Sequence, residues 1–221
     1  MTRLVIFAKA PQPGAVKTRL IPALGAEGAA TLARAMLDHT LQQSVAAGLD
    51  AVELCMSPAP GDAAWDGVVL PAGVACTAQG AGDLGERMDR AMQRALTLHH
   101  GPVLLIGTDC PALDCEHLRQ AARQLAQHDA VLIPVADGGY VLIGLQGPCP
   151  DIFANMPWST STVTTETLQR LDALGLRAWQ GPVLHDIDEA GDLVHLPVGF
   201  MAQKHLAKSV SSPINTCASS S

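Results

Sequence analysis

Short apolar segments alternate along the chain with longer segments in which apolar residues recur every three or four positions. The apolar segments Leu4–Ala8, Ala51–Met56 and Val103–Ile106 predict strands, and the unbroken third run is typical of the centre of a parallel sheet. The recurring spacing predicts helices, of which the longest covers Glu27–Ala47 and another follows a capping box at Asp83. Further strands are expected over 131–134, 140–145 and 183–187, short extended pieces over 68–70 and 74–77, and further helices over 115–127 and 159–174.

The alternation of strands and helices predicts the fold class. It indicates an α/β fold with three layers, α/β/α, built around a mainly parallel central sheet. Right-handed crossovers are expected to join the parallel strands. No internal repeat or linker interrupts residues 1–203, which we expect to form a single domain. Small polar residues dominate 204–221 and predict a disordered tail.

Composition narrows the class of protein. Of the 221 residues 48% are apolar, which argues against disorder, and no apolar run approaches the roughly 18 residues of a membrane span. The net charge of −7 and the aromatic content of 3% argue against a nucleic-acid partner. The first apolar run is too short for a signal peptide and the six cysteines are scattered, so we expect a cytoplasmic protein with free thiols. Cys110, Cys115 and His117 raise a zinc site as an alternative, but a fourth ligand at suitable spacing is missing.

The loop after the first strand concentrates positive charge. It holds Lys9, Lys17 and Arg19 around Gly14, although the whole chain has only four lysines. Ligands of open α/β sheets bind at the carboxyl ends of the strands, where glycine lets backbone amides approach an anion and cations neutralise it. These four residues are therefore candidates for binding phosphates, and a solvated surface loop is the alternative. A P-loop is excluded because two residues separate the glycine from the lysine that should follow it directly.

Three aspartates are candidates for a metal site. Asp109 follows the buried strand 103–106 on a tight loop, where a carboxylate is well placed to hold Mg²⁺ or Mn²⁺. Asp186 and Asp188 alternate along an extended segment, so both side chains point the same way. A turn or helix cap is the alternative for Asp109, and a calcium loop is a weak alternative for the second pair. Asp192 is expected to support a short helix.

Two further segments are candidates for binding a second substrate. Asp137 and Gly138 belong to a turn in which the glycines permit close ligand approach and the carboxylate could hold hydroxyl groups; a plain turn is the alternative. Tyr140 begins the strand that follows. Trp158 and Ser159 lie at a hydroxyl-rich helix start, which can receive a phosphate or a sugar, although ordinary capping explains the pattern equally well.

Six motifs, taken together and in order, resemble a bacterial family of glycosyltransferase-A-like (GT-A) proteins. This family is related to the 2-phospholactate guanylyltransferases and the molybdenum cofactor guanylyltransferases. The resemblance covers Leu4–Leu193, nearly the whole predicted domain. The motifs are F-A-K-A-P-Q-P-G-A-V-K-T-R-L (7–20), G-D-L-G-E-R-M (82–88), G-T-D-C-P (107–111), D-G-G-Y-V-L-I-G-L (137–145), W-S-T (158–160) and D-I-D-E-A-G-D-L (186–193).

The resemblance implies a GT-A fold, which is the nucleotide-diphospho-sugar transferase-like fold, with a metal site near the centre of its sheet. By this resemblance Asp109 is the first metal ligand and Asp186 and Asp188 complete the site. The implied cofactor is Mg²⁺ or Mn²⁺, and the implied partners are a nucleotide and a small-molecule acceptor.

The same resemblance gives roles to residues outside the metal site. Lys17 and Arg19 would hold the phosphates of the nucleotide, and Arg87 would be a further phosphate partner. Asp137 and Tyr140 would face the second substrate.

Two reactions are open to this set of residues, with Lys17 and Asp109 as the expected catalytic residues. We favour nucleotidyl transfer from an NTP to a small anionic acceptor with release of pyrophosphate, because the loop cations suit a triphosphate. Glycosyl transfer from an NDP-sugar to a small acceptor is the alternative, supported by the family's label and by Asp137. A non-catalytic nucleotide-binding module is a third interpretation, which the presence of all three candidate metal carboxylates argues against.

Overall fold

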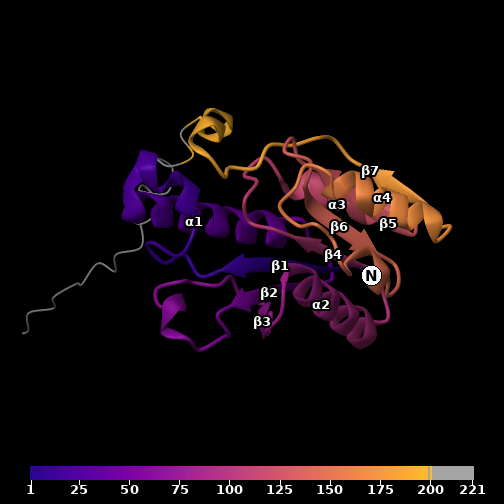
Figure 1. Ribbon diagram of the computed structural model, residues 1–221. Coiled ribbons are helices and arrows are strands. Elements are labelled where there is room, and N and C mark those ends of the chain that lie inside the picture. The colour runs from indigo at the N-terminus through magenta and orange to yellow at the C-terminus, as the bar shows by residue number, and fades with distance from the viewer. Residues whose placement is uncertain (199, 201–221) are drawn as a thin grey trace, which may run out of the picture.

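A computed structural model describes residues 1–198 and 200, and in it a seven-stranded sheet carries helices on both faces (Figure 1). The strand order is β3-β2-β1-β4-β6-β5-β7. The strands are β1 Arg3–Lys9, β2 Ala51–Ser57, β3 Val74–Ala78, β4 Val103–Ile106, β5 Ala130–Pro134, β6 Tyr140–Leu145 and β7 Ala178–Gln180. The helices are α1 Ile21–Ala46, α2 Leu84–His99, α3 Cys115–Leu125 and α4 Val163–Ala173.

The sheet is mainly parallel, as the sequence predicts. β1 pairs in parallel with β2 and β4, β2 with β3, and β5 with β7. β6 alone runs the other way, antiparallel to β4 and β5. The carboxyl ends of β1, β4, β5 and β7 therefore meet at one edge of the sheet, and the turn into β6 starts from that edge as well. The strand 103–106 is fully buried but lies between a parallel and an antiparallel neighbour.

Alternate residues of each strand divide the core into the two interfaces of a three-layer fold. Leu4 and Ile6 of β1 pack in a cluster with α1 and α3, whereas Val5 between them packs with α2 and α4. This is the period of two that a strand buried on both faces requires. The amphipathic α2 begins at the predicted capping box, in which Asp83 and Glu86 each accept a hydrogen bond from the other's backbone N–H.

Two predicted helix starts differ from the structure. The first helix starts at Ile21 rather than Glu27, and a kink at Gly25 (φ 71°) divides it. α4 starts at Val163 rather than Ser159, because Ser159 has a left-handed backbone (φ 64°) that no helix accepts.

The predicted strand pieces at the two margins of the sheet also differ. Residues 183–187 form no strand, and Leu184 alone makes an isolated bridge to Val135. The edge strand β7 lies earlier, over Ala178–Gln180, where only three residues pair and leave too short a pattern to detect. Residues 68–70 are likewise outside the strands, and β3 covers the second of the two predicted pieces.

Three other expectations concern membrane spans, the cysteines and the C-terminal tail. Among the described helices, none combines the length and apolar character needed to cross a bilayer. The five described cysteines are free, three of them buried, with Cys76 exposed and Cys115 intermediate. Cys217 and the predicted tail 204–221 lie outside the described residues.

Replacement of Gly144 by Ala tests the packing at the centre of the sheet. Gly144 is paired with Leu104 on one side and Val131 on the other, and an added Cβ would lie 2.5 Å and 2.6 Å from their side chains. We expect Gly144→Ala to lower the free energy of unfolding by about 1–3 kcal/mol through overpacking. Gly147→Ala is the matched control, since its Cβ would meet open space. Urea unfolding measures both, and equal stability of the two variants would contradict this packing.

Candidate functional site

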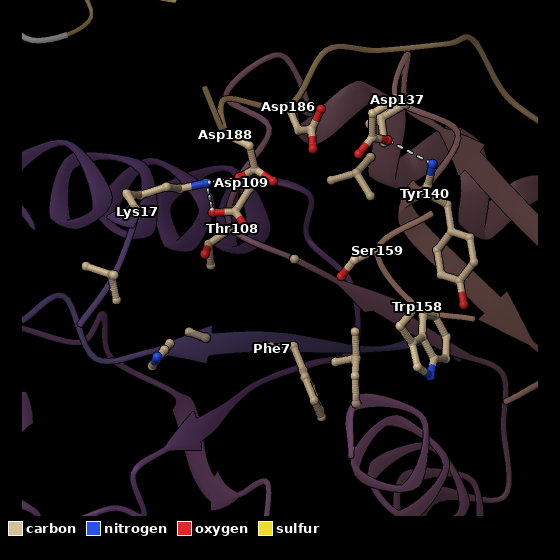
Figure 2. Close-up of a pocket in the computed structure, with 18 of the residues that line it drawn as sticks. Phe7, Lys17, Thr108, Asp109, Asp137, Tyr140, Trp158, Ser159, Asp186 and Asp188 are labelled. Carbon is tan, nitrogen blue, oxygen red and sulfur yellow. Dashed lines mark hydrogen bonds and ion pairs between the residues drawn. The ribbon is translucent and has the colours of Figure 1, made fainter. Parts of the chain in front are cut away.

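A cavity of about 620 Å³ opens at the carboxyl edge of the sheet (Figure 2). Its lining includes the loop after β1, the loop after β4, the β5–β6 turn, the segment before α4 and the segment after β7. The first turn of α2 and the residue after β3 also contribute. Every residue predicted for the site lines this cavity, with the exception of Gly14 and Gly138. The structure thus brings distant parts of the chain together. The predicted residues that line the cavity are Lys9, Lys17, Arg19, Arg87, Asp109, Asp137, Tyr140, Trp158, Ser159, Asp186 and Asp188.

Lys17 binds two carboxylates at one end of the cavity. Its ammonium lies 2.6 Å from Asp109 Oδ1 and 2.7 Å from Asp188 Oδ1. The side chain is 7% exposed, whereas those of Asp109 and Asp188 are 51% and 40% exposed. Burial alone would lower the pKa of Lys17, but the two carboxylates outweigh it and raise the pKa above its ordinary value. Lys17 therefore stays a cation at neutral pH.

The backbone around Lys17 aims its side chain into the cavity. Lys17 has a left-handed conformation (φ 48°, ψ 41°), which is rare for a residue with a Cβ and is found where the surroundings enforce it. A short 3-10 helix, Thr18–Leu20, follows, and the Leu20 amide donates to the Lys17 carbonyl at 2.8 Å. Leu20 is completely buried against α1 and anchors the turn.

Backbone contacts hold the two carboxylates in reach of Lys17. The Ile187 amide donates to the Asp109 carbonyl at 2.8 Å, and the Ile187 side chain is fully buried. The amides of Asp188 and Glu189 donate to Asp192 Oδ2 at 3.0 and 2.7 Å, at the start of a short 3-10 helix. Asp192 supports that helix as predicted, and this support fixes the segment that carries Asp188.

Asp186 lies between Asp188 and Asp137 in the same view (Figure 2). Burial, followed by the nearby charges of Asp137 and Asp188, raises the pKa of Asp186 to about 6. Carboxylates are therefore crowded at this end of the cavity, and a bound cation would relieve their repulsion.

The three predicted metal ligands are not arranged as a ready metal cluster. Within 1–198 and 200, no three His, Cys, Asp or Glu side chains form a group that could hold a metal ion. The Lys17 ammonium binds Asp109 and Asp188 instead. The donors nevertheless fit Mg²⁺ or Mn²⁺, because they are all carboxylate oxygens and because one cation, the ammonium, already binds between two of them.

The other cations of the loop lie in different environments. Lys9 donates to the Ala15 carbonyl at 2.8 Å and so holds the loop together. Arg19 is exposed and lies 3.7 Å from Glu189. Gly14 turns the loop with φ 76° and does not line the cavity. The alternative of a solvated surface loop is therefore wrong for Lys17, whereas Arg19 is solvated and also lines the cavity.

A buried glutamine that sequence analysis missed orients Arg87. Gln79 is 5% exposed and donates to the carbonyls of Ala8 and Cys55 at 3.0 and 3.1 Å. Its amide oxygen accepts a hydrogen bond from Arg87 Nη1 at 2.9 Å. The available signal was a polar residue directly after β3 and before the glycine-rich stretch that leads into α2.

Aromatic side chains form the opposite end of the cavity. Tyr140 and Trp158 meet edge to face, with ring centroids 6.4 Å apart, and Phe7 lines the same end (Figure 2). Gly85 makes room for Trp158, because a Cβ there would lie 2.8 Å from the indole nitrogen. Burial raises the pKa of Tyr140, so its hydroxyl stays neutral. Ser159, with its left-handed backbone, lies between the aromatic end and the charged end.

The turn before β6 does not give Gly138 the predicted role. A Cβ at Gly138 would collide with the backbone of Ser161, so the close neighbour of this glycine is protein and the approach of a ligand does not explain it. The Thr164 amide donates to the Gly138 carbonyl at 2.9 Å, which ties the first turn of α4 to the turn before β6. Asp137 accepts from the Gly139 amide at 2.8 Å, as in a plain turn, and also lines the cavity.

The zinc alternative finds no support in the described residues. His117 Nδ1 lies 2.8 Å from Asp114 Oδ1 as part of the capping box of α3. Cys110 and Cys115 belong to no metal-binding group there.

Comparison with protein families adds an independent observation. A family profile described as "Uncharacterized protein conserved in bacteria (DUF2064)" matches residues 40–160, more than half of the chain. That segment includes Asp109, Asp137 and Tyr140. A comparison with curated proteins gave no match.

Solved structures share the fold. A crystal structure of a candidate nucleotide-diphospho-sugar transferase from Desulfovibrio desulfuricans G20 matches with a TM-score of 0.81 and 32% identity, over 95% of this chain and 96% of that one. Rv0371c of Mycobacterium tuberculosis H37Rv in complex with manganese matches with 0.51 and 16% identity, over 87% and 96%. CMP:2-keto-3-deoxy-manno-octonic acid synthetase complexed with CTP matches with 0.53 and 10% identity, over 94% and 99%. The last two likenesses concern the fold alone.

Replacement of Gly138 by Ala tests the attachment of the segment 158–162. Gly138 (φ 93°) and Gly175 (φ 70°) are both left-handed, so alanine at either costs about 1–2 kcal/mol of backbone strain. Only at Gly138 would the Cβ also collide with Ser161, whereas at Gly175 it meets open space. We therefore expect Gly138→Ala to lose about 1–3 kcal/mol more unfolding free energy than Gly175→Ala. Chemical denaturation compares the two, and losses of equal size would refute the contact.

Proposed function

The chain belongs to the bacterial DUF2064 family, and from this premise we propose that it is a metal-dependent nucleotidyltransferase. In the proposed reaction, a small anionic acceptor receives the nucleotidyl group of an NTP and pyrophosphate leaves. The chain shares its fold with a nucleotide-transfer enzyme complexed with CTP and with a protein complexed with manganese, which supports a nucleotide and a divalent cation as ligands.

The observation that carries the proposal is the buried ammonium of Lys17 beside carboxylates in an open cavity. Phosphoryl chemistry requires positive charge on the phosphates and oxygen ligands for a divalent cation at the same place. Both are present at this end of the cavity, at the edge of the sheet where α/β proteins bind their ligands.

The reaction assigns the residues as follows. An acceptor oxygen attacks the α-phosphorus, the bond from that phosphorus to the bridging oxygen breaks, and the electron pair leaves with pyrophosphate. Lys17 and Arg19 neutralise the phosphates, and Arg87, held by Gln79, is a further phosphate partner. Asp109, Asp186 and Asp188 would hold Mg²⁺ or Mn²⁺, which when bound supplies charge neutralisation on the phosphates.

The acceptor would lie at the other end of the cavity. Asp137 and Ser159 offer groups that bind hydroxyls, while Tyr140 and Trp158 offer an apolar wall.

Glycosyl transfer from an NDP-sugar is the second candidate. It is favoured by the relative from Desulfovibrio desulfuricans, at 32% identity, whose name is that of a candidate nucleotide-diphospho-sugar transferase. A non-catalytic nucleotide-binding module is less well supported, since it has no need of the crowded carboxylates around Asp186.

Replacement of Asp109 by Asn tests the metal assignment. We expect Asp109→Asn to lower the rate of pyrophosphate release from NTPs by at least about a hundredfold, because one metal ligand is lost. The assay supplies the four common NTPs, Mg²⁺ or Mn²⁺, and a set of phosphorylated and carboxylated hydroxy acids. Asp172→Asn, an exposed aspartate of α4, is the control and should keep the wild-type rate. Full activity of Asp109→Asn would refute the assignment.

Replacement of Lys17 by Met separates the two reactions. A triphosphate carries more charge than the diphosphate of an NDP-sugar, so the loss of one cation should weaken NTP binding more. We expect the melting-point shift produced by NTPs with Mg²⁺ to fall further than the shift produced by NDP-sugars. A larger loss for NDP-sugars would favour glycosyl transfer.

A further inference from the structure

We propose that Lys17 is an exchangeable occupant of the cation position between Asp109 and Asp188. Its ammonium holds the two carboxylates while the site is empty and leaves them for the nucleotide phosphates when a divalent cation binds. The inference rests on the proposed function for the identity of both ligands.

The first argument is that the position suits one cation at a time. The ammonium touches the Oδ1 atoms of both aspartates at 2.6 and 2.7 Å. A divalent cation held by the same two carboxylates would stand close to that ammonium, and the two cations would repel each other. Binding of the metal therefore requires the ammonium to move.

The second argument is that the ammonium has somewhere to move. Lysine carries its charge on a flexible four-carbon stem. The cavity beyond the pair is open, since Asp109 and Asp188 are 51% and 40% exposed. The left-handed backbone at Lys17 and the buried Leu20 fix the base of the stem and not its tip.

The third argument concerns what replaces the lost partners. A buried ammonium without a counter-charge is costly, so it leaves two carboxylates only for another anion. The phosphates of a nucleotide supply that anion in the same cavity. Metal and nucleotide therefore assist each other's binding. The phosphates give the displaced ammonium a new partner, and the metal gives the two carboxylates a new partner.

The test measures Mn²⁺ binding to the protein without nucleotide or acceptor, by electron paramagnetic resonance at fixed pH and ionic strength. We compare wild type with Lys17→Met, Lys17→Arg and Lys9→Met. Lys9 is the matched control, because it lines the same cavity but its ammonium binds the Ala15 carbonyl instead of a carboxylate.

Lys17→Met should bind Mn²⁺ at least roughly tenfold more tightly than wild type, because the competing cation is gone. Lys17→Arg keeps the charge and should stay close to wild type, and so should Lys9→Met. Equal affinity of Lys17→Met and wild type, or an equal gain in Lys9→Met, would overturn the proposal. Thermal unfolding checks the fold, and Lys17→Gln replaces Lys17→Met if the latter does not fold.

The outcome is independent of the transfer reaction. If no nucleotidyl transfer is found but Lys17→Met gains Mn²⁺ affinity, the exchange stands and the proposed reaction fails. If the protein transfers nucleotides and Lys17→Met gains no affinity, the reaction stands and the exchange fails.

Discussion

The arrangement of the site depends on the need of one buried ammonium for a counter-charge. Lys17 is too deeply buried to be solvated, and an unpaired charge there would cost more than a small domain can readily offset. Two aspartates satisfy it, and they come from the loop after β4 and from the segment after β7. One electrostatic requirement therefore joins three parts of the chain that are distant in sequence.

The sheet makes this pairing geometrically available. β1 and β4 are parallel neighbours, so the loops that carry Lys17 and Asp109 leave the sheet at the same edge. β7 runs parallel to β5, and the chain beyond it returns along that edge until the Ile187 amide reaches the Asp109 carbonyl. The reversal at β6 adds the turn with Asp137 to the same edge. The chemistry of the cavity thus follows from the direction of the strands rather than from any contiguous motif.

Because the site is assembled from distant segments, only part of the structure could be predicted from the sequence. Apolar runs and the capping box at Asp83 are local signals, and they identified the main strands and α2 because burial and helix capping act over a few residues. Many residues of the cavity were predicted from their chemistry and their positions after strands, whereas Arg87 was named only through the resemblance and Gln79 was missed. Local patterns could not show the left-handed backbone of Ser159, the collision that makes Gly138 necessary, or the three hydrogen bonds of the Gln79 side chain, since each depends on contacts with other segments of the chain. They could not show the exchange of partners around Lys17 either, because the spacing of Asp109, Asp186 and Asp188 says nothing of a cation supplied by the protein.

The balance of charges in the cavity indicates that, in the proposed reaction, the metal does more than hold the nucleotide in place. Four cations and four aspartates line it, so the lining by itself offers an incoming polyanion little net attraction. The protein as a whole carries a charge of −7 and repels polyanions at long range. Lys17 contributes least to attraction, because two carboxylates already neutralise it. A divalent cation on those carboxylates would add positive charge to the cavity and would also release the ammonium of Lys17 to bind phosphate. For the function proposed here, nucleotide capture and metal binding are therefore one event, which is what separates this site from a passive nucleotide-binding cleft.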